Sequence, residues 1–320
     1  MALKYRNELC RLGNLLWNFQ DYSHEEVIEH INFCVSNCEI PLEIIFSVLD
    51  FKFSTNHKMA NQILQFIEQL IKCTNFKTPK DSDFFYETLM KILKLKGLID
   101  PDVYPEEVNQ SVDEILSYYD FGEVEKAIEN DDIDALDSIY SSFGYESDRT
   151  TPSDIDLAAE YGSIKCFRYL YEHGAIITSD TTSGAFMGNN PEIINICEQN
   201  SDIISDYADT TCIYHHNEEY RYLADKYSID YTWYSSLTTL NFELFFDKLD
   251  RTEFPMNDDE AYDALSSAVC LGITPIVQLF LEKGCSPLLK DNATGRNCID
   301  LAVNCKFPQI AEMMRKYISK

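Results

Sequence analysis

The stretch "TPSDIDLAAEYGSIKCFRYLYEHGAIIT", residues 151–178, decides the fold. Ala158 and Ala159 are small where one helix approaches another closely, and Gly162 suits a left-handed residue that ends the first helix. Four apolar residues then follow at +4, +5, +7 and +8 from this glycine, on one face of a second helix: Cys166, Phe167, Tyr169 and Leu170. Gly174 ends that helix twelve residues after Gly162, so the stretch predicts a helical hairpin.

The same register recurs along the second two thirds of the chain. A small residue lies four positions before each expected turn, and the series reads Ala127, Ala158, Ala185, Cys212, Ser236, Ala268 and Ala302. The turn residues four positions later include Gly162, Asn189, His216, Gly272 and Lys306. This order of parts, with Thr151-Pro152 as an opener, is typical of the ankyrin repeat. We expect an all-α fold, in which an ankyrin-like helical-hairpin solenoid follows an α-helical N-terminal domain.

The spacing of the small residues predicts where the repeats differ. The spacings are 31, 27, 27, 24, 32 and 34 residues, whereas a full ankyrin unit with its projecting β-turn finger needs about 33. We therefore expect bare hairpins in the degenerate middle units, and fingers only around 141–151, 253–260 and 284–296. A solenoid also needs capped ends. Arg315, Lys316 and Lys320 supply a polar C-terminal cap, and the N-terminal cap is expected from what precedes residue 111.

The charge of the chain changes near residue 98. Residues 1–98 hold 11 Lys or Arg against 12 Asp or Glu, whereas residues 99–320 hold 15 against 42, a net charge of −27. Apolar spacings of three and four predict helices throughout the first segment, one of them starting at a capping box of Ser23 and Glu26. We predict an α-helical N-terminal domain at 1–98, a linker at 99–110 and about seven repeat units at 111–320.

Three segments of the chain carry a family resemblance. The helical segment 44–71, the degenerate segment 188–232 and the more regular segment 268–303 resemble ankyrin-like proteins of unknown function that are abundant in trichomonad and amoebic protists. Members usually run longer, with more full repeats after the degenerate ones. The resemblance spans nearly all of the chain, but its motifs are structural. It implies a fold and a binding role, and it names no partner.

Composition limits the classes of function. An acidic face repels phosphate backbones, so we expect no nucleic-acid partner. No apolar run approaches 18 residues, and the N-terminal segment lacks the order of a signal peptide, so we expect no membrane insertion. Eleven cysteines without close pairs favour reduced thiols. The protein is expected in the cytoplasm, with nuclear and cytoskeletal locations left open.

Motifs of catalysis and metal binding fail on spacing. His24 and His30 are six residues apart, whereas the zinc-protease motif needs histidines four apart. Two further sets are interpreted as structural, namely His30 with Cys34 and Cys38, and Cys212 with His215 and His216. There is no P-loop, dinucleotide glycine fingerprint or nucleophile elbow. We therefore expect a non-enzymatic protein with no metal and no cofactor.

Binding is expected on the concave side of the array. The two positions before each turn should face that groove, beginning with Glu129 and Asn130. From this set we select, as candidate partner contacts, Glu160, Tyr161, Met187, Tyr214, His215, Cys270 and Leu271. Several of these side chains are equally compatible with burial between repeats.

The acidity of the array predicts a protein partner with a basic segment, held by electrostatic steering and a few buried anchors. The leading hypothesis is an adaptor or scaffold. One alternative is a structural component of a cytoskeletal or axonemal assembly. A second alternative is a ubiquitin-ligase substrate receptor, because "IPLEIIFSVLDF" (residues 40–51) resembles the opening of an F-box.

Overall fold

The computed structural model describes residues 2–74, 87–100, 102, 104, 106–117, 122–143 and 153–319. These residues are predominantly helical, and they contain no β-strand beyond one isolated bridge. The chain divides into two compact units. Unit 1 combines Met1–Val112 with Thr232–Lys320, and unit 2 is Asp113–Tyr231.

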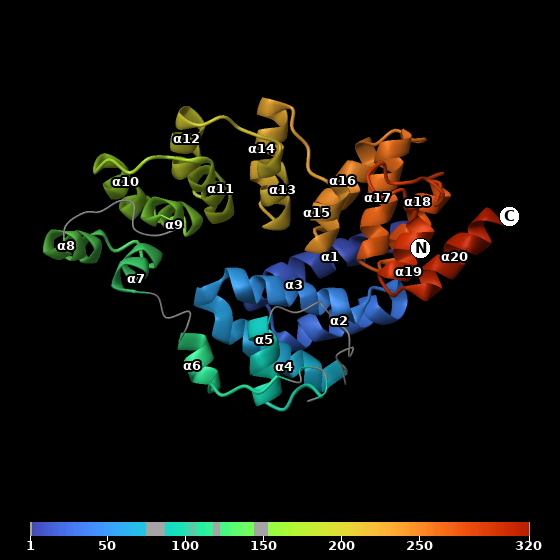
Figure 1. Ribbon diagram of the computed structural model, residues 1–320, viewed down its shortest axis with the longest axis horizontal. Coiled ribbons are helices and arrows are strands. Elements are labelled where there is room, and N and C mark those ends of the chain that lie inside the picture. Colours follow the sequence, from blue (N-terminus) through green and yellow to red (C-terminus); the bar gives the residue numbers. More distant parts are fainter. Residues whose placement is uncertain are drawn as a thin grey trace. The chain divides into compact units, whose positions relative to one another are not determined.

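The N-terminal part of unit 1 is helical as predicted. Its α-helices are α1 (Arg6–Trp17), α2 (His24–Cys38), α3 (Leu42–Thr55), α4 (Ala60–Thr74) and α5 (Glu87–Leu95), with short 3-10 helices at Ala2–Tyr5, Phe19–Asp21 and His57–Met59 (Figure 1). α6 (Val112–Ser117) follows at the boundary with unit 2. Ser23 caps α2, because its hydroxyl oxygen accepts a hydrogen bond from the Glu26 backbone N–H at 3.2 Å.

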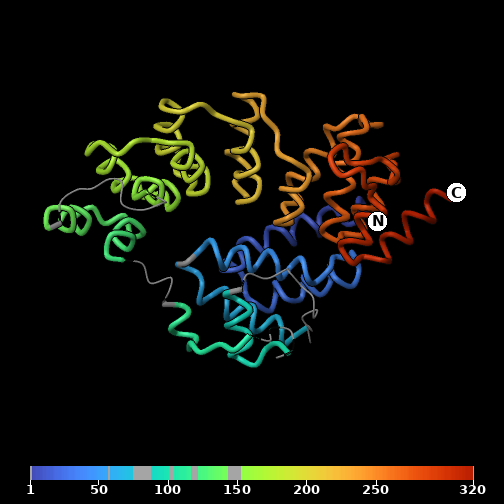
Figure 2. The backbone as a smooth tube through the Cα atoms, viewed as in Figure 1, coloured from blue at the N-terminus to red at the C-terminus, as the bar shows by residue number. Residues whose placement is uncertain are grey.

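The described residues then form seven helical hairpins. Figure 2 shows the course of their backbone. We call the first helix of each hairpin inner and the second outer. Unit 2 holds α7 (Glu123–Glu129) with α8 (Ile133–Phe143), α9 (Asp154–Glu160) with α10 (Ile164–Glu172), α11 (Ser179–Gly188) with α12 (Pro191–Asn200), and α13 (Asp206–Ile213) with α14 (Asn217–Tyr227). Unit 1 holds α15 (Trp233–Thr238) with α16 (Phe242–Arg251), α17 (Asp258–Cys270) with α18 (Thr274–Glu282), and α19 (Cys298–Asn304) with α20 (Pro308–Ile318). Within each unit the inner helices of successive hairpins pack on one another, as in an ankyrin-like helical solenoid.

A left-handed residue joins the two helices of every hairpin. The positive φ angles fall at Asp131, Gly162, Asn189, His215, Leu240, Gly272 and Lys306. Six of these residues lie four positions after the predicted small residue, and the fourth hairpin is shifted by one. Its turn is at His215 rather than His216, so Thr211 rather than Cys212 takes the small position.

Backbone hydrogen bonds explain this correction. The Ser163 N–H donates to the Ala158 carbonyl at 2.9 Å, and the His216 N–H donates to the Thr211 carbonyl at 2.8 Å in the same pattern. Thr211 fits a buried position because its hydroxyl donates to carbonyls of its own helix, at 2.9 Å to Ala208. The hydroxyl is thereby satisfied without a partner from another helix.

The predicted fingers have three different outcomes. At 284–296 the chain forms a narrow hairpin closed by an antiparallel bridge between Lys290 and Asn297. At 253–260 the prediction was wrong, because α17 already begins at Asp258 and Asn257 caps it through a bond from the Glu260 N–H at 2.9 Å. Most of the third finger, at 141–151, lies outside the described residues.

The N-terminal helices contact the C-terminal hairpins inside unit 1. α1 packs on α16, and the segment Ala2–Tyr5 packs on α18. The Arg6 guanidinium lies 2.7 Å from the Asp250 carboxylate and 5.0 Å from the centroid of the Phe246 ring. The grouping thus differs from the predicted succession of domain, linker and array. One unit boundary lies two residues beyond the predicted linker, and the other, between Tyr231 and Thr232, falls inside the predicted array.

Candidate functional site

The candidate site is built from three successive inner helices of unit 2, α7, α9 and α11. α9 begins at a capping box in which the Asp156 carboxylate accepts a hydrogen bond from the Ser153 N–H at 3.0 Å. The turn after it is at Gly162, whose φ of 66° is the left-handed geometry that suits glycine. Glu160 is the last residue of the helix and Tyr161 caps it. The capping box and the left-handed glycine therefore place both Glu160 and Tyr161 at the C-terminal end of α9.

Close helix packing brings α11 against this end of α9. A Cβ atom placed on Gly188 would lie 2.2 Å from the Ala159 carbonyl oxygen and 2.7 Å from that of Glu160. A Cβ atom placed on Gly184 would lie 3.0 Å from the Asp156 carbonyl oxygen. The backbone of α11 therefore lies directly on α9, and Met187, next to Gly188, belongs to the turn of helix that packs beside Glu160.

Burial and acidic neighbours determine the electrostatics of the site. Glu160 is half-buried, and this burial raises the pKa of its carboxyl. Within the described ranges its carboxylate has no hydrogen-bond or ion-pair partner. Burial also raises the pKa of Tyr161, and the nearby carboxylates of Glu129, Glu160 and Glu125 raise it further. Tyr161 packs partly against the apolar core of unit 2.

We call these five residues the inner-helix site: Glu125, Glu129, Glu160, Tyr161 and Met187. Three carboxylates lie near the Tyr161 ring, and the backbone of α11 beside Met187 packs against Glu160. Such a set can hold a cationic side chain, because carboxylates pair with the charge while the ring and the methionine contact its aliphatic part. Glu129 stands among the predicted groove positions but not among the selected contacts. The sequence feature that could have selected Glu129 is its position, which is equivalent to that of Glu160 two residues before the turn of its own hairpin.

The predicted contacts Tyr214 and His215 belong to the fourth hairpin and are not part of the inner-helix site. His215 has a φ of 58° and forms the turn, so it is not one of the two residues before the turn. Tyr214 caps α13, and its ring stacks on His216 at 6.1 Å. The His216 Nε2 atom lies 2.9 Å from the Met187 carbonyl oxygen, and burial lowers the pKa of this histidine. His216 thereby ties α14 to α11.

Cys270 and Leu271 lie in unit 1, whereas the other five predicted contacts lie in unit 2. Burial, and to a lesser degree the charge of and hydrogen bond to the neighbouring Cys305 thiol, raise the pKa of the Cys270 thiol to about 12. Leu271 caps α17 and is half-buried. The structure therefore does not assemble all seven predicted residues within one compact unit.

Unit 2 holds most of the negative charge of the chain. Residues 113–231 contain 26 Asp or Glu against 6 Lys or Arg, a net charge of −20 out of −28. The remaining residues carry a net charge of only −8. The inner-helix site therefore lies in the most acidic part of the molecule, and cations are attracted to unit 2 as a whole.

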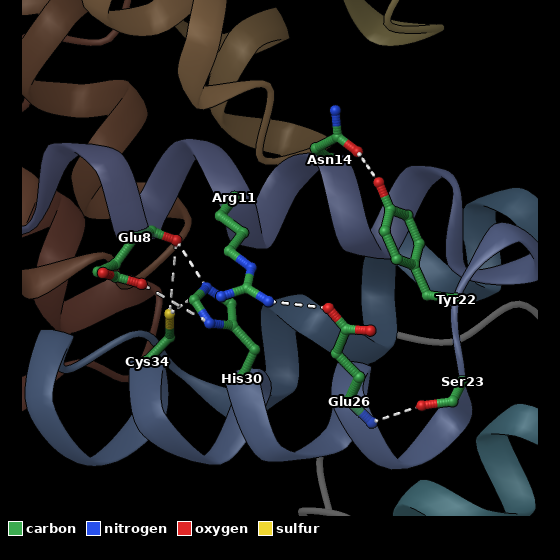
Figure 3. A network of polar contacts seen from close by, with 8 residues as sticks. All are labelled: Glu8, Arg11, Asn14, Tyr22, Ser23, Glu26, His30 and Cys34. Atoms are coloured by element: carbon green, nitrogen blue, oxygen red, sulfur yellow. Dashed lines mark hydrogen bonds and ion pairs between the residues drawn. The ribbon is translucent and has the colours of Figure 1, made fainter.

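His30 and Cys34 of α2 contact the backbone of α1 (Figure 3). The His30 Nε2 atom lies 2.9 Å from the Glu8 carbonyl oxygen, and the Cys34 thiol points to the same oxygen at 3.8 Å. Burial raises the pKa of Cys34. On the opposite side of this interface Arg11 pairs with Glu26 at 2.8 Å. These contacts join two helices, as the structural interpretation of His30 and Cys34 requires.

In the part of the chain that the structure describes, no three His, Cys, Asp or Glu side chains are grouped to hold a metal ion. Nor is any helix in those ranges both long enough and apolar enough to span a membrane.

Comparison with known proteins gives partial matches. The model of a domain of unknown function, DUF3447, matches residues 173–248, from just after α10 into α16. No curated protein matches the chain. Among solved structures, the chain is similar to the ankyrin repeat domain of human ASB11, with 16% identity, a TM-score of 0.41, and coverage of 61% of this chain and 98% of that one. It is also similar to EF0377, an ankyrin repeat protein, with 18% identity, a TM-score of 0.28 and the same two coverages.

Proposed function

We propose that this protein is a non-enzymatic interaction scaffold that binds a basic segment of a protein partner at the inner-helix site. The observation that carries the proposal is the half-buried Glu160 carboxylate, which has no partner within the described residues. Burial of an unpaired carboxylate is unfavourable, and a cation that pairs with it removes this cost. A lysine or arginine side chain from a partner supplies that cation.

The remaining parts of the site support the same class of partner. Glu125 and Glu129 raise the local negative potential around Tyr161. The Tyr161 ring and Met187 provide apolar surface for the methylene groups of a basic side chain. The net charge of −20 on unit 2 would steer such a segment toward the site before contact.

The test combines partner capture with measured affinity. The protein is used as bait in extracts of its native cells, captured proteins are identified, and each is purified. The Kd is then measured at 50 and 300 mM NaCl for the natural protein and for Glu160→Gln/Tyr161→Ala. We expect the variant to raise the Kd about tenfold or more, since it removes a charge-assisted contact and an aromatic anchor. High salt should weaken binding sharply.

Glu172→Gln is the matched control, because Glu172 is an exposed residue of α10 in the same unit. It removes one negative charge outside the site and should change the Kd less than twofold. A partner that binds all three proteins equally, at both salt concentrations, would contradict the proposal.

The two alternative functions make different predictions. A fixed component of a cytoskeletal assembly would stay with the insoluble pellet at high salt, whatever the residue at position 160. A ligase receptor would need accessible side chains on residues 40–51, yet none of these residues is exposed. Six of them are buried in α3: Ile44, Ile45, Phe46, Val48, Leu49 and Asp50. This burial disfavours the F-box interpretation.

A further inference from the structure

A pocket of about 240 Å³ is lined by residues of two outer helices of unit 2, α12 and α14. Both helices are labelled in Figure 1. These helices belong to neighbouring hairpins, and neither contributes a residue to the inner-helix site. The lining of the pocket includes three glutamates, two apolar residues and a tyrosine: Glu198, Glu218, Glu219, Pro191, Ile194 and Tyr222.

Glu198 holds the two helices together and fixes one wall of the pocket. Its side chain is only 5% exposed. It accepts hydrogen bonds from the hydroxyls of Tyr222 and Tyr227, both at 2.9 Å, and from the Lys226 ammonium at 3.0 Å. The Lys226 ammonium neutralises this carboxylate. Because all three donors come from α14, the position of the Glu198 side chain against α14 is also set. The pocket wall is therefore formed before any ligand arrives.

Glu218 and Glu219 leave the pocket with uncompensated negative charge. Both lie in the first turn of α14, where the helix dipole favours carboxylates. Among the described residues, neither side chain has an ion-pair or hydrogen-bond partner. The dipole explains why two glutamates are tolerated there. It does not explain why they stand at the edge of an apolar pocket that Pro191 and Ile194 line.

We propose that this pocket binds one arginine side chain from a basic segment of a protein partner. The three methylene groups would lie against Pro191 and Ile194, and the guanidinium would pair with Glu218 and Glu219. Arginine fits better than lysine, because its planar guanidinium makes paired bonds to carboxylates and stacks on aromatic rings. Tyr222 offers such a ring and already has a cation beside it, with Lys226 Nζ 5.0 Å from its centroid.

The pocket extends the proposed function by adding a second cation site on different helices. The experiment uses the full chain labelled with ¹³C in isoleucine and methionine methyl groups. Ile194 reports on the pocket, Met187 reports on the inner-helix site, and Ile155 in the core of unit 2 monitors folding. The probes are N-acetyl-arginine amide, N-acetyl-lysine amide and N-acetyl-citrulline amide. Citrulline has nearly the shape of arginine without its charge.

We expect the Ile194 signal to shift most with the arginine probe, less with lysine and least with citrulline. Glu218→Gln/Glu219→Gln should raise the Kd of the arginine probe about fivefold, since two exposed charge pairs together contribute on the order of 1 kcal/mol. The matched control, Asp202→Asn/Asp225→Asn, removes two exposed charges of unit 2 outside the pocket and should leave the Kd within twofold.

Three results would overturn the proposal: an Ile194 signal that does not move, equal shifts with arginine and citrulline, or equal losses in both double variants. Met187 separates this proposal from the proposed function. An arginine response at Met187 without one at Ile194 removes only the pocket. The reverse result removes only the inner-helix site.

Discussion

Lys52 is the residue whose environment departs furthest from that of its type. It is 4% exposed, and its ammonium lies 5.1 Å from the Trp17 ring centroid and 5.0 Å from that of Phe19. Its Nζ also donates a hydrogen bond to the Trp17 carbonyl. Burial lowers the pKa of Lys52 from 10.5 to about 8, and Asp21 offsets part of that effect.

This pKa predicts a defined pH dependence of stability. Below pH 8 the lysine is protonated in both the folded and the unfolded state, so the cost of burying its charge is fully present. Between pH 8 and 10.5 the folded state loses its proton first, and the Lys52 contribution to stability rises with pH. Buried thiols act in the opposite sense, because burial raises their pKa, to about 12 for Cys166.

The Lys52 contribution is isolated by comparing the natural protein with Lys52→Met in urea unfolding at pH 7 and 9.5. The free energy of unfolding of the natural protein, relative to that of Lys52→Met, should increase by about 2 kcal/mol from pH 7 to pH 9.5. Lys72→Met, at an exposed position of α4, should give the same difference at both pH values. A constant difference for Lys52→Met as well would show that the buried lysine does not titrate in this range.

At the scale of elements, the contact between α9 and α11 depends on Gly188. A methyl group there would meet the Ala159 carbonyl oxygen at 2.2 Å. Alanine favours a helix over glycine by only about 1 kcal/mol, so the clash should dominate. We expect Gly188→Ala to destabilise unit 2 by about 2 kcal/mol, measured as faster amide hydrogen exchange in α9 and α11. Asn195→Ala, at an exposed position of α12, should leave exchange unchanged. Equal exchange rates in both variants would contradict the close packing.

Individual hairpins were predictable from sequence because each is decided by a few local residues. A small residue, a turn residue four positions later and an apolar pair locate most of the turns. The register failed in the fourth hairpin because Thr211 and Cys212 are adjacent and both fit a close helix contact. α1 was covered only by the general expectation of helices throughout residues 1–98, and its bounds were not predicted, although Leu9, Leu12 and Leu16 follow a helical spacing and are fully buried.

The candidate site was predictable only in part. The repeat register placed Glu160 and Tyr161 at the end of an inner helix, and the structure shows the packing that brings α11 beside them. The pocket between α12 and α14 was not predicted, because it depends on how far two outer helices stand apart. Sequence spacing along one helix carries no information on that distance.

At the scale of the whole molecule, the two units differ in self-repulsion. Unit 2 carries −20 on 119 residues, whereas unit 1 carries −8 on 201. Salt screens repulsion between like charges, so it should stabilise unit 2 more than unit 1. Raising NaCl from 20 to 500 mM should therefore slow hydrogen exchange in the hairpins α9 to α14 more than in α2 to α4. Equal slowing in both units would contradict this expectation.

The contact between α1 and α16 can form only late in synthesis, because its two helices are far apart in the sequence. Arg6 and Asp250 are 244 residues apart. A ribosome adds roughly 5–20 residues per second, so about 10 to 50 s pass between the synthesis of α1 and that of α16. All of unit 2 emerges within that interval. The middle of the chain can therefore fold before the unit that contains its beginning.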